Sequence, residues 1–392
     1  MRALDILHTR LSSAFAFMHS ARWNAVWLTV QAVIAGERLW LTALGQARPG
    51  TARRKHAIKA ADRLLGNGHL AAEQSLIYRA LAAMIVAPRS HPIILVDTVE
   101  VRPRWFALVA SVPFNGRSFI ICAHVSRAQK PKKAILLRFL RSLRQIIPPD
   151  CRPVFVSDAG FESPWFAAVE RFGWDYVGRI RGKVRVLVDG EWMANQALHR
   201  RATNRAKNVG RAGFRWPPHE RRVVLSKEPQ TRHRCRRYRT GRIAHKQADH
   251  DFRRSAHEPW VLVTSLAARP SAVVAVFALR MRIEETFRDV KNLRWGWSLR
   301  HCGSRSRGRL EALLLIGAIA LFVQQIAGCA AENLGLHREH QANTETRRRV
   351  LSIFVLGGLV LRSETARLLA RDLARAIDEV QTSSRDFLVI NT

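Results

Sequence analysis

The spacing of apolar residues divides the chain into regions of different character. Up to about residue 88, apolar residues recur at helical spacing, as in AVWLTVQAVI (25–34) and HAIKAADRLL (56–65). A repeat of three to four residues places these side chains on one face of a helix. The pattern therefore predicts a helical N-terminal domain, residues 1–88.

The pattern changes to that of strands at about residue 91. Apolar and β-branched residues fill PIILVDTVEV (92–101), and FALVASVPFNGRSFIICAHV (106–125) predicts two strands joined by an Asn115-Gly116 hairpin turn. The pattern then alternates between helices in KKAILLRFLRSLRQII (132–147) and SPWFAAVERFGW (163–174) and strands in RPVFVSDAGF (152–161) and DYVGRIRGKVRVLV (175–188). This order predicts a mixed α/β fold, with a five-stranded mixed sheet flanked by helices.

Basic residues dominate the next region. Residues 179–254 hold 22 Lys and Arg against 6 Asp and Glu, with short strand-like pieces such as VRVLV (184–188) and RRVVL (221–225). We interpret residues 186–256 as a basic β-rich insertion whose positive charges contact phosphate. Four of its residues are of types that bind zinc, but their spacing matches no common zinc site. They are His233, Cys235, His245 and His250.

Helices are predicted again after the strand in EPWVLVTSL (258–266). One long helix is expected from about Ser271 to Asn292, and an apolar helix from about Gly308 to Asn333, followed by amphipathic helices. We therefore expect five domains: the helical N-terminal domain at 1–88, the sheet-containing core in two parts at 89–185 and 257–335, the insertion at 186–256, and a helical C-terminal region at 336–392.

A basic cluster follows a predicted turn in the N-terminal domain. A short helix, a glycine-containing turn and the start of a basic helix are predicted for the segment LTALGQARPGTARRKH (41–56). This order is typical of helix-turn-helix DNA readers. The alternative is a solvated face of an all-α domain. The residues expected to contact DNA are Arg53, Arg54, Lys55, Lys59 and Arg63.

Charge and composition narrow the class of protein. The formal net charge of the 392 residues is +35 at pH 7, which favours a polyanionic partner, above all nucleic acid. The apolar run from Ala312 to Val323 is too short to span a bilayer, so we interpret it as a buried core helix and expect no membrane association. Five cysteines without paired spacing, and an N-terminus without the apolar stretch of a signal peptide, favour the cytoplasm.

Two aspartates are predicted to stand at the ends of strands. Asp97 closes IILVD and Asp158 closes VFVSD. If the first and fourth strands are neighbours, the two carboxylates lie close together at the edge where open α/β sheets bind ligands. Such a pair favours a hard cation such as Mg²⁺ between the oxygens. For Asp158, a turn-forming role is the alternative.

A third carboxylate lies in the stretch FALRMRIEETFRDVK (277–291). On a helix, Glu284 shares one face with Arg280 and Lys291, whereas Glu285 faces elsewhere. A surface ladder of ion pairs is one explanation of this face. The other is that Glu284 completes a metal site with the two aspartates, while Arg280 and Lys291 hold the phosphodiester.

Three motifs give the chain a family resemblance. The first is Asp97 followed by Thr98, and the second is Asp158, Gly160 and Phe161. The third is Phe277, Arg280, Glu284 and Lys291, in which two, three and six residues separate each member from the next. Together with LDILH, KHAIKAADRLLGN, SDAGF and EPWVL, they resemble the cut-and-paste DDE transposases of bacterial insertion sequences. The likeness is to the insertion-sequence-four family, in the branch of composite transposons, and extends over nearly the whole chain. In that family's signature of tyrosine, arginine, glutamate and lysine, Phe277 stands where tyrosine is expected.

The resemblance implies an RNase H-like core in which Asp97, Asp158 and Glu284 hold two Mg²⁺ ions, for which Mn²⁺ can substitute. It implies nicking of the transposon end by water, a DNA hairpin intermediate, reopening of the hairpin, and attack of the same 3′-OH on target DNA. It also implies that Trp260 stacks on a flipped base, with core packing as the alternative. Because Phe277 lacks the tyrosine hydroxyl, a weakened enzyme is expected.

The implied partners are double-stranded DNA and a second copy of the chain. The DNA comprises the inverted-repeat ends of the element and its target, and the C-terminal helices are expected to hold a homodimer in the nucleoid of a bacterial cytoplasm. Two alternatives remain: a catalytically weak or inactive transposase-derived DNA-binding regulator, and an RNase H-like nuclease without strand transfer. The three acids favour catalysis over the first alternative, and the full signature helix favours transposition over the second.

Overall fold

The structure is a computed structural model in which the chain forms two compact units. It describes residues 3–161, 163–182, 184–214, 219–227, 258–294, 296–342 and 344–386. The first unit comprises Met1–Pro153 and Leu279–Ile390, and the second comprises Val154–Ala278 with Asn391–Thr392. Because the chain leaves the first unit and later returns to it, the first unit combines residues that are far apart in the sequence.

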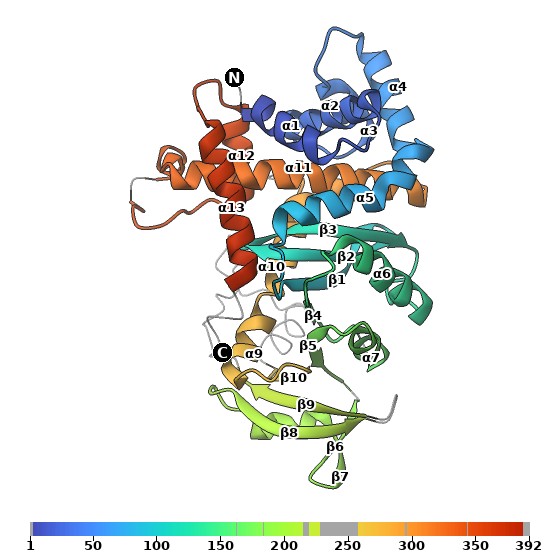
Figure 1. The fold of residues 1–392 in the computed structure, drawn as a ribbon, viewed down its shortest axis with the longest axis vertical. Helices are drawn as coiled ribbons and strands as arrows, with labels where there is room; N and C mark the ends of the chain where they lie inside the picture. Colours follow the sequence, from blue (N-terminus) through green and yellow to red (C-terminus); the bar gives the residue numbers. More distant parts are fainter. Residues whose placement is uncertain are drawn as a thin grey trace, which may run out of the picture. The chain divides into compact units, whose positions relative to one another are not determined.

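The N-terminal part of the first unit is helical, as predicted. Its helices are α1 (Ala3–Ala14), α2 (Ser20–Gly36), α3 (Leu41–Ala47), α4 (Arg54–Leu65) and α5 (Gly68–Ile85) (Figure 1). The short helix, turn and basic helix expected between residues 41 and 65 are confirmed as α3 and α4. Gly45 allows the two helices to pack closely, because a Cβ atom there would lie 2.5 Å from Ile58 Cα and 2.7 Å from its backbone nitrogen.

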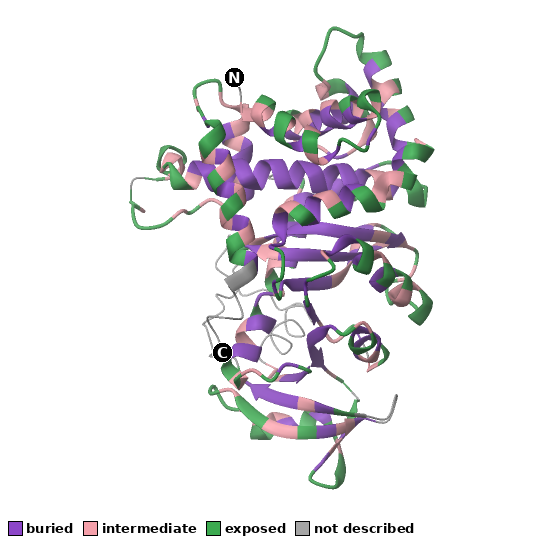
Figure 2. Ribbon diagram, in the orientation of Figure 1, coloured by how far each residue is buried: buried purple, intermediate pink, exposed green. Residues whose placement is uncertain are grey.

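The core of the first unit is built around the helix α11 (Arg307–Asn333). By length and composition α11 resembles a membrane span, with a mean hydropathy of 2.1, but 94% of its apolar window is buried inside the protein (Figure 2). It contacts α2, α5, one strand and the C-terminal helices α12 (Ile353–Arg362) and α13 (Ala370–Asp386). The prediction of a buried core helix is therefore confirmed, and neighbours on all sides explain why α11 is apolar around its whole circumference.

Three antiparallel strands form the sheet of the first unit. They are β1 (Ile93–Arg102), β2 (Trp105–Phe114) and β3 (Arg117–Ser126), and β2 lies between the other two. The predicted hairpin turn is confirmed, because Asn115 and Gly116 both have positive φ angles, 40° and 80°. The prediction that a strand ends at Asp97 is wrong. β1 continues to Arg102 because β2 pairs with it along both halves, with Asp97 opposite Val109.

The helices that follow the sheet correct a second expectation. The helix predicted for 132–147 is confirmed as α6 (Lys133–Ile146). The single helix predicted from 271 to 292 is instead two, α9 (Pro270–Ala278) and α10 (Met281–Lys291). Between them the amide of Arg282 donates to the carbonyl oxygen of Leu279, three residues back. This tighter turn interrupts the α-helical ladder, and the boundary between the two units falls at the same place.

The second unit contains seven strands and two α-helices among its described residues. The strands are β4 (Val154–Ser157), β5 (Asp175–Ile180), β6 (Arg185–Val188), β7 (Glu191–Ala194), β8 (Lys207–Phe214), β9 (His219–Ser226) and β10 (Trp260–Thr264), in the order β4-β5-β10-β9-β8-β6-β7. The helices are α7 (Ser163–Arg171) and α9, and β7 leads into the 3-10 helix η1 (Asn195–Arg201). β4 and β5 are parallel, and the remaining neighbours are antiparallel.

Among the described residues of the basic insertion, 186–256, the structure has strands β6 to β9. The run 175–188 was expected to be one strand but forms β5 and β6, with Gly182 at a φ of 70° in the turn between them. Only glycine adopts that conformation without strain, so the strand must end before it. The segment 232–246 and the four zinc-type residues at 233, 235, 245 and 250 lie outside the described residues.

Candidate active site

A pocket of about 520 Å³ in the first unit brings together three of the residues singled out in the sequence. Asp97 comes from the middle of β1, and Glu284 and Lys291 come from α10. Glu284 and Lys291 are seven residues apart, which places both on one face of the helix. The other charged residues that line the pocket are Glu100, Arg288 and Arg300.

The orientation of α10 is set by its contacts with β3. Ile283, Phe287 and Val290 are buried, and the backbone amide of Ser118 donates to Thr286 Oγ1 over 2.8 Å. On the same side, Arg117 Nε lies 2.6 Å from Asp289 Oδ2. With this face of the helix fixed against the sheet, Glu284 is directed into the pocket. Nothing in the sequence pattern singled out Arg117, Ser118 or Thr286, because the contact joins segments far apart in the chain.

Arg280 lies between the two carboxylates of the pocket. Its Nη1 atom is 2.6 Å from Glu284 Oε1 and 3.9 Å from Asp97 Oδ2. A hydrogen bond orients Asp97, whose Oδ1 accepts from the amide of Thr98 over 2.7 Å. One cationic group is therefore held by both acids, which indicates that their oxygens converge on a position that favours positive charge.

Positive charge at the pocket is also supplied by Lys291. Burial lowers the pKa of Lys291, and the nearby Arg300 lowers it further, whereas Glu100, Asp97 and Glu284 act in the opposite direction. Arg300 is itself held by Glu100, at 3.2 Å. The ammonium of Lys291 is thus kept in a partly desolvated position, where an incoming anion interacts with it more strongly than in water.

Glu285 serves as an internal comparison for Glu284. It is paired with Arg288 on its own helix, at 2.8 Å, and it does not line the pocket. Of the two adjacent glutamates, Glu284 lines the pocket and Glu285 does not.

Asp158 belongs to the second unit and follows directly after β4, as the sequence predicted. The amide of Phe161 donates to the carbonyl oxygen of Asp158 over 3.0 Å, which closes the turn. The ring of Phe161 lies 5.1 Å from that of Trp165, and Arg221 of β9 donates to Ser163 Oγ over 2.7 Å. The turn that carries Asp158 is thus held by α7 and by a residue of the insertion.

Trp260, also in the second unit, is the first residue of β10 and is half-buried. It pairs with Ser226 of β9, and its ring meets that of Phe277 edge-on, with the centroids 4.9 Å apart. Phe277 is buried. This contact supports the packing role of Trp260 that the sequence left as the alternative.

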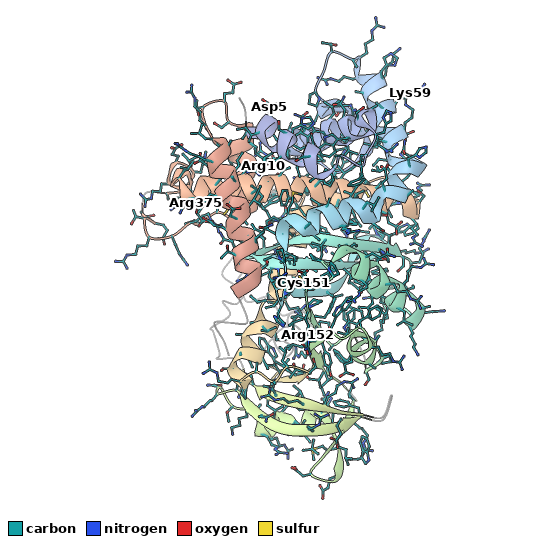
Figure 3. All side chains as sticks on the ribbon, in the orientation of Figure 1. Asp5, Arg10, Lys59, Cys151, Arg152 and Arg375 are labelled. Carbon is teal, nitrogen blue, oxygen red and sulfur yellow. The ribbon has the colours of Figure 1, made fainter. Side chains whose placement is uncertain are left out.

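The basic cluster on and before α4 is exposed at every position. Lys55, Lys59 and Arg63 share one face of the helix, and Arg53 and Arg54 stand at its start; Figure 3 shows Lys59 projecting from the helix. The five side chains form one basic surface on the first unit. Contact with DNA at this surface remains a prediction.

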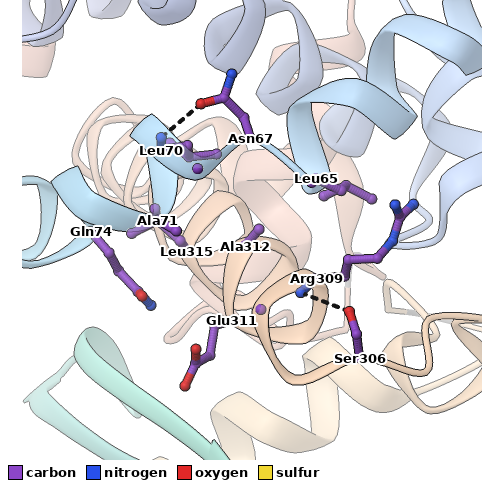
Figure 4. Close-up of a pocket in the computed structure, with 13 residues that line it drawn as sticks. Leu65, Asn67, Leu70, Ala71, Gln74, Ser306, Arg309, Glu311, Ala312 and Leu315 are labelled. Carbon is purple, nitrogen blue, oxygen red and sulfur yellow. Dashed lines mark hydrogen bonds between the residues drawn. The ribbon is translucent and has the colours of Figure 1, made fainter.

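A further cavity of about 230 Å³ lies between α5 and α11 in the first unit (Figure 4). Its polar groups mainly cap helices: Asn67 Oδ1 accepts from the amide of Leu70 at the start of α5, and Ser306 Oγ accepts from the amide of Arg309 at the start of α11. It contains none of the residues predicted in the sequence to bind metal or DNA.

The two carboxylates in the pocket are suited to a metal ion. Their donors are oxygens, which hard divalent cations prefer, and they already share a cationic group. Within the described part of the chain, no group of three or more His, Cys, Asp or Glu side chains is gathered into a metal-binding cluster. In the first unit the pocket offers the carboxylates of Asp97 and Glu284, and a third, that of Glu100, is paired with Arg300.

Comparison with known proteins identifies one family. Residues 90–323 match the family described as "Transposase DDE domain", a segment that includes β1, β4 and α10. No curated protein matches the chain.

Proposed function

The chain belongs to the transposase DDE domain family, and from this membership we propose that it catalyses cut-and-paste transposition of DNA. The observation that carries the proposal is the shared pocket of Asp97, Glu284 and Lys291, with Arg280 between the two acids. In this proposal Asp158 supplies the third carboxylate, and the core is RNase H-like. The mixed α/β composition of both units supports that assignment.

Asp97, Asp158 and Glu284 would hold divalent metal ions, Mg²⁺ in the first place, with two ions per site and Mn²⁺ as a substitute. When bound, such ions activate the attacking oxygen and stabilise the leaving one. Two observations in the first unit support the binding of a divalent ion by these residues. Asp97 and Glu284 offer oxygen donors, and both acids already share the guanidinium of Arg280.

The basic residues of the pocket are proposed to bind the scissile phosphodiester. Lys291 and Arg300 line the pocket, and Arg280 lies beside its acids, so a phosphate that enters meets cations on more than one side. The guanidinium of Arg280 can also pair with two phosphate oxygens at once. These contacts hold the phosphorus in line between the attacking and leaving oxygens.

The proposed reaction is a series of displacements at phosphorus. Water cleaves one strand at the element end and leaves a 3′-OH, which attacks the opposite strand and forms a hairpin. Water then reopens the hairpin, and the same 3′-OH attacks target DNA. Trp260 is proposed to stack on the base that must leave the helix when the hairpin forms, since an aromatic face accepts any base.

We further propose that the protein acts as a homodimer on double-stranded DNA in the nucleoid of a bacterial cytoplasm. Two DNA ends and one target must be joined in the same complex, and a symmetric pair of subunits supplies two active sites. The C-terminal helices α12 and α13 are the proposed dimer contacts, and the basic surface on α4 is proposed to bind the inverted repeats.

A second function is favoured by one residue. Phe277 lacks the hydroxyl expected at its position in the family signature, and it is buried against Trp260. If this change removes activity, the protein binds element ends without cutting them and acts as a regulator of transposition. A nuclease without strand transfer is the third candidate.

The experiment that separates these functions is cleavage of linear DNA that carries the repeats flanking the gene. The native chain and Asp97→Asn are compared in the presence of Mg²⁺, with products resolved on a denaturing gel. Nicks, hairpins and strand-transfer products from the native chain alone are expected. DNA that is bound but uncut in both reactions would favour the regulator, and nicks without hairpins or joined products would favour the nuclease.

A further inference from the structure

A groove on the first unit, separate from the carboxylate pocket, has the chemistry of a nucleic-acid site. It measures about 600 Å³ and lies between the start of α3 and the loop at residues 297–306. Trp40 and Thr42 line one wall, and His301, Ser304 and Arg305 line the other. None of these residues belongs to the proposed catalytic site, and only Thr42 lies in a segment singled out in the sequence, the predicted helix-turn-helix at 41–56.

The loop at 297–306 has a firmly anchored backbone. Trp297, Leu299, Cys302 and Ser304 are buried, and Arg102 of β1 donates to the carbonyl oxygen of Ser304 over 2.7 Å. The exposed side chains between these anchors include three basic ones, which are Arg300, His301 and Arg305. The backbone of the loop therefore holds its basic groups in a fixed position. Because the loop is already ordered, binding a ligand costs little conformational entropy.

The aromatic wall of the groove is tied to the same loop. The amide of Leu39 donates to the carbonyl oxygen of Trp297 over 2.8 Å, which fixes the chain immediately before Trp40. The ring of Trp40 is half-buried, and the guanidinium carbon of Arg38 lies 5.8 Å from its centroid. The two walls are thus joined by a main-chain hydrogen bond.

The charge of the groove is positive. Arg309 also lines it but pairs with Asp62 of α4, so Arg305 provides most of the attraction for an anion. The loop also connects the groove with the carboxylate pocket, because Arg300, one residue before His301, lines that pocket. A DNA strand that leaves the pocket along the loop would pass Arg300, His301 and Arg305 in turn.

We propose that this groove binds unpaired nucleotides of a DNA strand next to the element end, with a base or sugar against Trp40 and a phosphate at Arg305. An aromatic face beside basic groups is the usual means of binding single strands. The volume is that of a small-molecule site, which accommodates individual nucleotides and excludes a double helix. The inference rests on the proposed function, since it specifies the form of DNA that the transposase accepts.

The test compares binding of two DNA ends by fluorescence anisotropy in EDTA, so that no cleavage occurs. One probe is a blunt duplex that carries the flanking repeat, and the other has the same sequence with a short single-stranded overhang. The native chain is expected to bind the overhang more tightly. Trp40→Ala should reduce affinity for the overhang by roughly fivefold or more, as for the loss of one stacked base, and leave the blunt duplex unchanged.

Further variants separate binding from folding. Arg305→Ala, at an exposed position, should weaken overhang binding and reduce its dependence on salt by about 0.7 in the logarithmic slope, the value for one phosphate contact with a single strand. Trp40→Phe should retain most of the preference because it keeps an aromatic face. Arg141→Ala, which removes an exposed arginine of α6, should change neither probe.

The proposal is overturned if the native chain binds both probes equally, or if Trp40→Ala and Arg305→Ala weaken both probes to the same extent. In the second case the groove would belong to a general duplex-binding surface. Because binding is measured without metal, an overhang preference in a protein that never cuts DNA would refute the proposed catalysis and leave this inference standing.

Discussion

Replacing Glu284 by glutamine tests whether this residue is part of the catalytic machinery or only of an ion pair. The substitution removes one negative charge and preserves the shape of the side chain. Glu284 is 42% exposed and pairs with Arg280 four residues before it, at 2.6 Å. Pairs of this kind contribute less than about 1 kcal/mol to the free energy of unfolding. A melting temperature within about 4 °C of the native value is therefore expected.

The expected effect on chemistry is much larger. Losing even an outer partner of a metal ligand costs about 10- to 100-fold in affinity or activity, so loss of a ligand should reduce end cleavage by more than about 100-fold. Cleavage is measured on the repeat-bearing DNA with Mg²⁺, binding of the uncut end by anisotropy, and binding of Mn²⁺ to the DNA-free protein by electron paramagnetic resonance. Cleavage and Mn²⁺ affinity should both fall, while end binding persists.

Glu285→Gln is the matched control, since it makes the same change one residue along α10. Glu285 pairs with Arg288 and does not line the pocket, so cleavage and Mn²⁺ affinity should stay near native. The reasoning is refuted if Glu284→Gln cuts DNA at a near-native rate, or if both variants lose activity equally. A large fall in melting temperature together with lost end binding would instead make Glu284 a structural residue.

Three other outcomes are expected. Trp260→Ala should stall the reaction at hairpin formation or opening while nicking survives on a denaturing gel, and an unchanged hairpin yield would remove Trp260 from the mechanism. Gly45→Ala should cost about 1–3 kcal/mol in the free energy of unfolding and weaken end binding, because the added Cβ would lie 2.5 Å from Ile58 Cα. The matched control Gly68→Ala adds a Cβ with nothing within 4 Å, and equal losses in the two variants would contradict the packing argument. Burial, followed by two nearby arginines, lowers the pKa of His124 to about 4 from the ordinary 6.5. The unfolded chain therefore binds the proton first, and stability should fall as the pH drops from about 6.5 to about 4. His124→Gln should flatten that dependence in urea unfolding, and an unchanged pH profile would assign the acid sensitivity to other groups.

Local patterns predicted the elements whose causes are local. The Asn115-Gly116 turn formed as expected because both residues tolerate a positive φ angle. The helix α11 was predicted as buried because the apolar run from Ala312 to Val323 is too short to span a bilayer, although the helix that contains it has 27 residues. The position of Asp158 after β4 followed from an apolar run that stops at a turn.

The mistaken predictions concern places where distant segments decide the local structure. Asp97 was expected at a strand end, but pairing with β2 extends β1 beyond it. The helix expected from 271 to 292 is interrupted at Leu279–Arg280, although the apolar spacing continues across the break. In both cases the spacing of residues was compatible with either structure, and contacts elsewhere in the fold selected one of them.

The sequence by itself determined the acids and bases of the candidate site, because the motifs and their intervals are properties of the chain. Only the tertiary structure decided that Asp97 and Glu284 share one pocket with Lys291 and that Arg280 lies between the two acids. The same holds for the anchored loop at 297–306 and the groove beside it. Each of these features joins segments from opposite ends of the chain, and hydrophobic periodicity describes only which way a side chain points from its own helix or strand. Which partner it meets is set by how the helices and strands pack, and in this protein residues 154–278 of the second unit separate the two segments of the first.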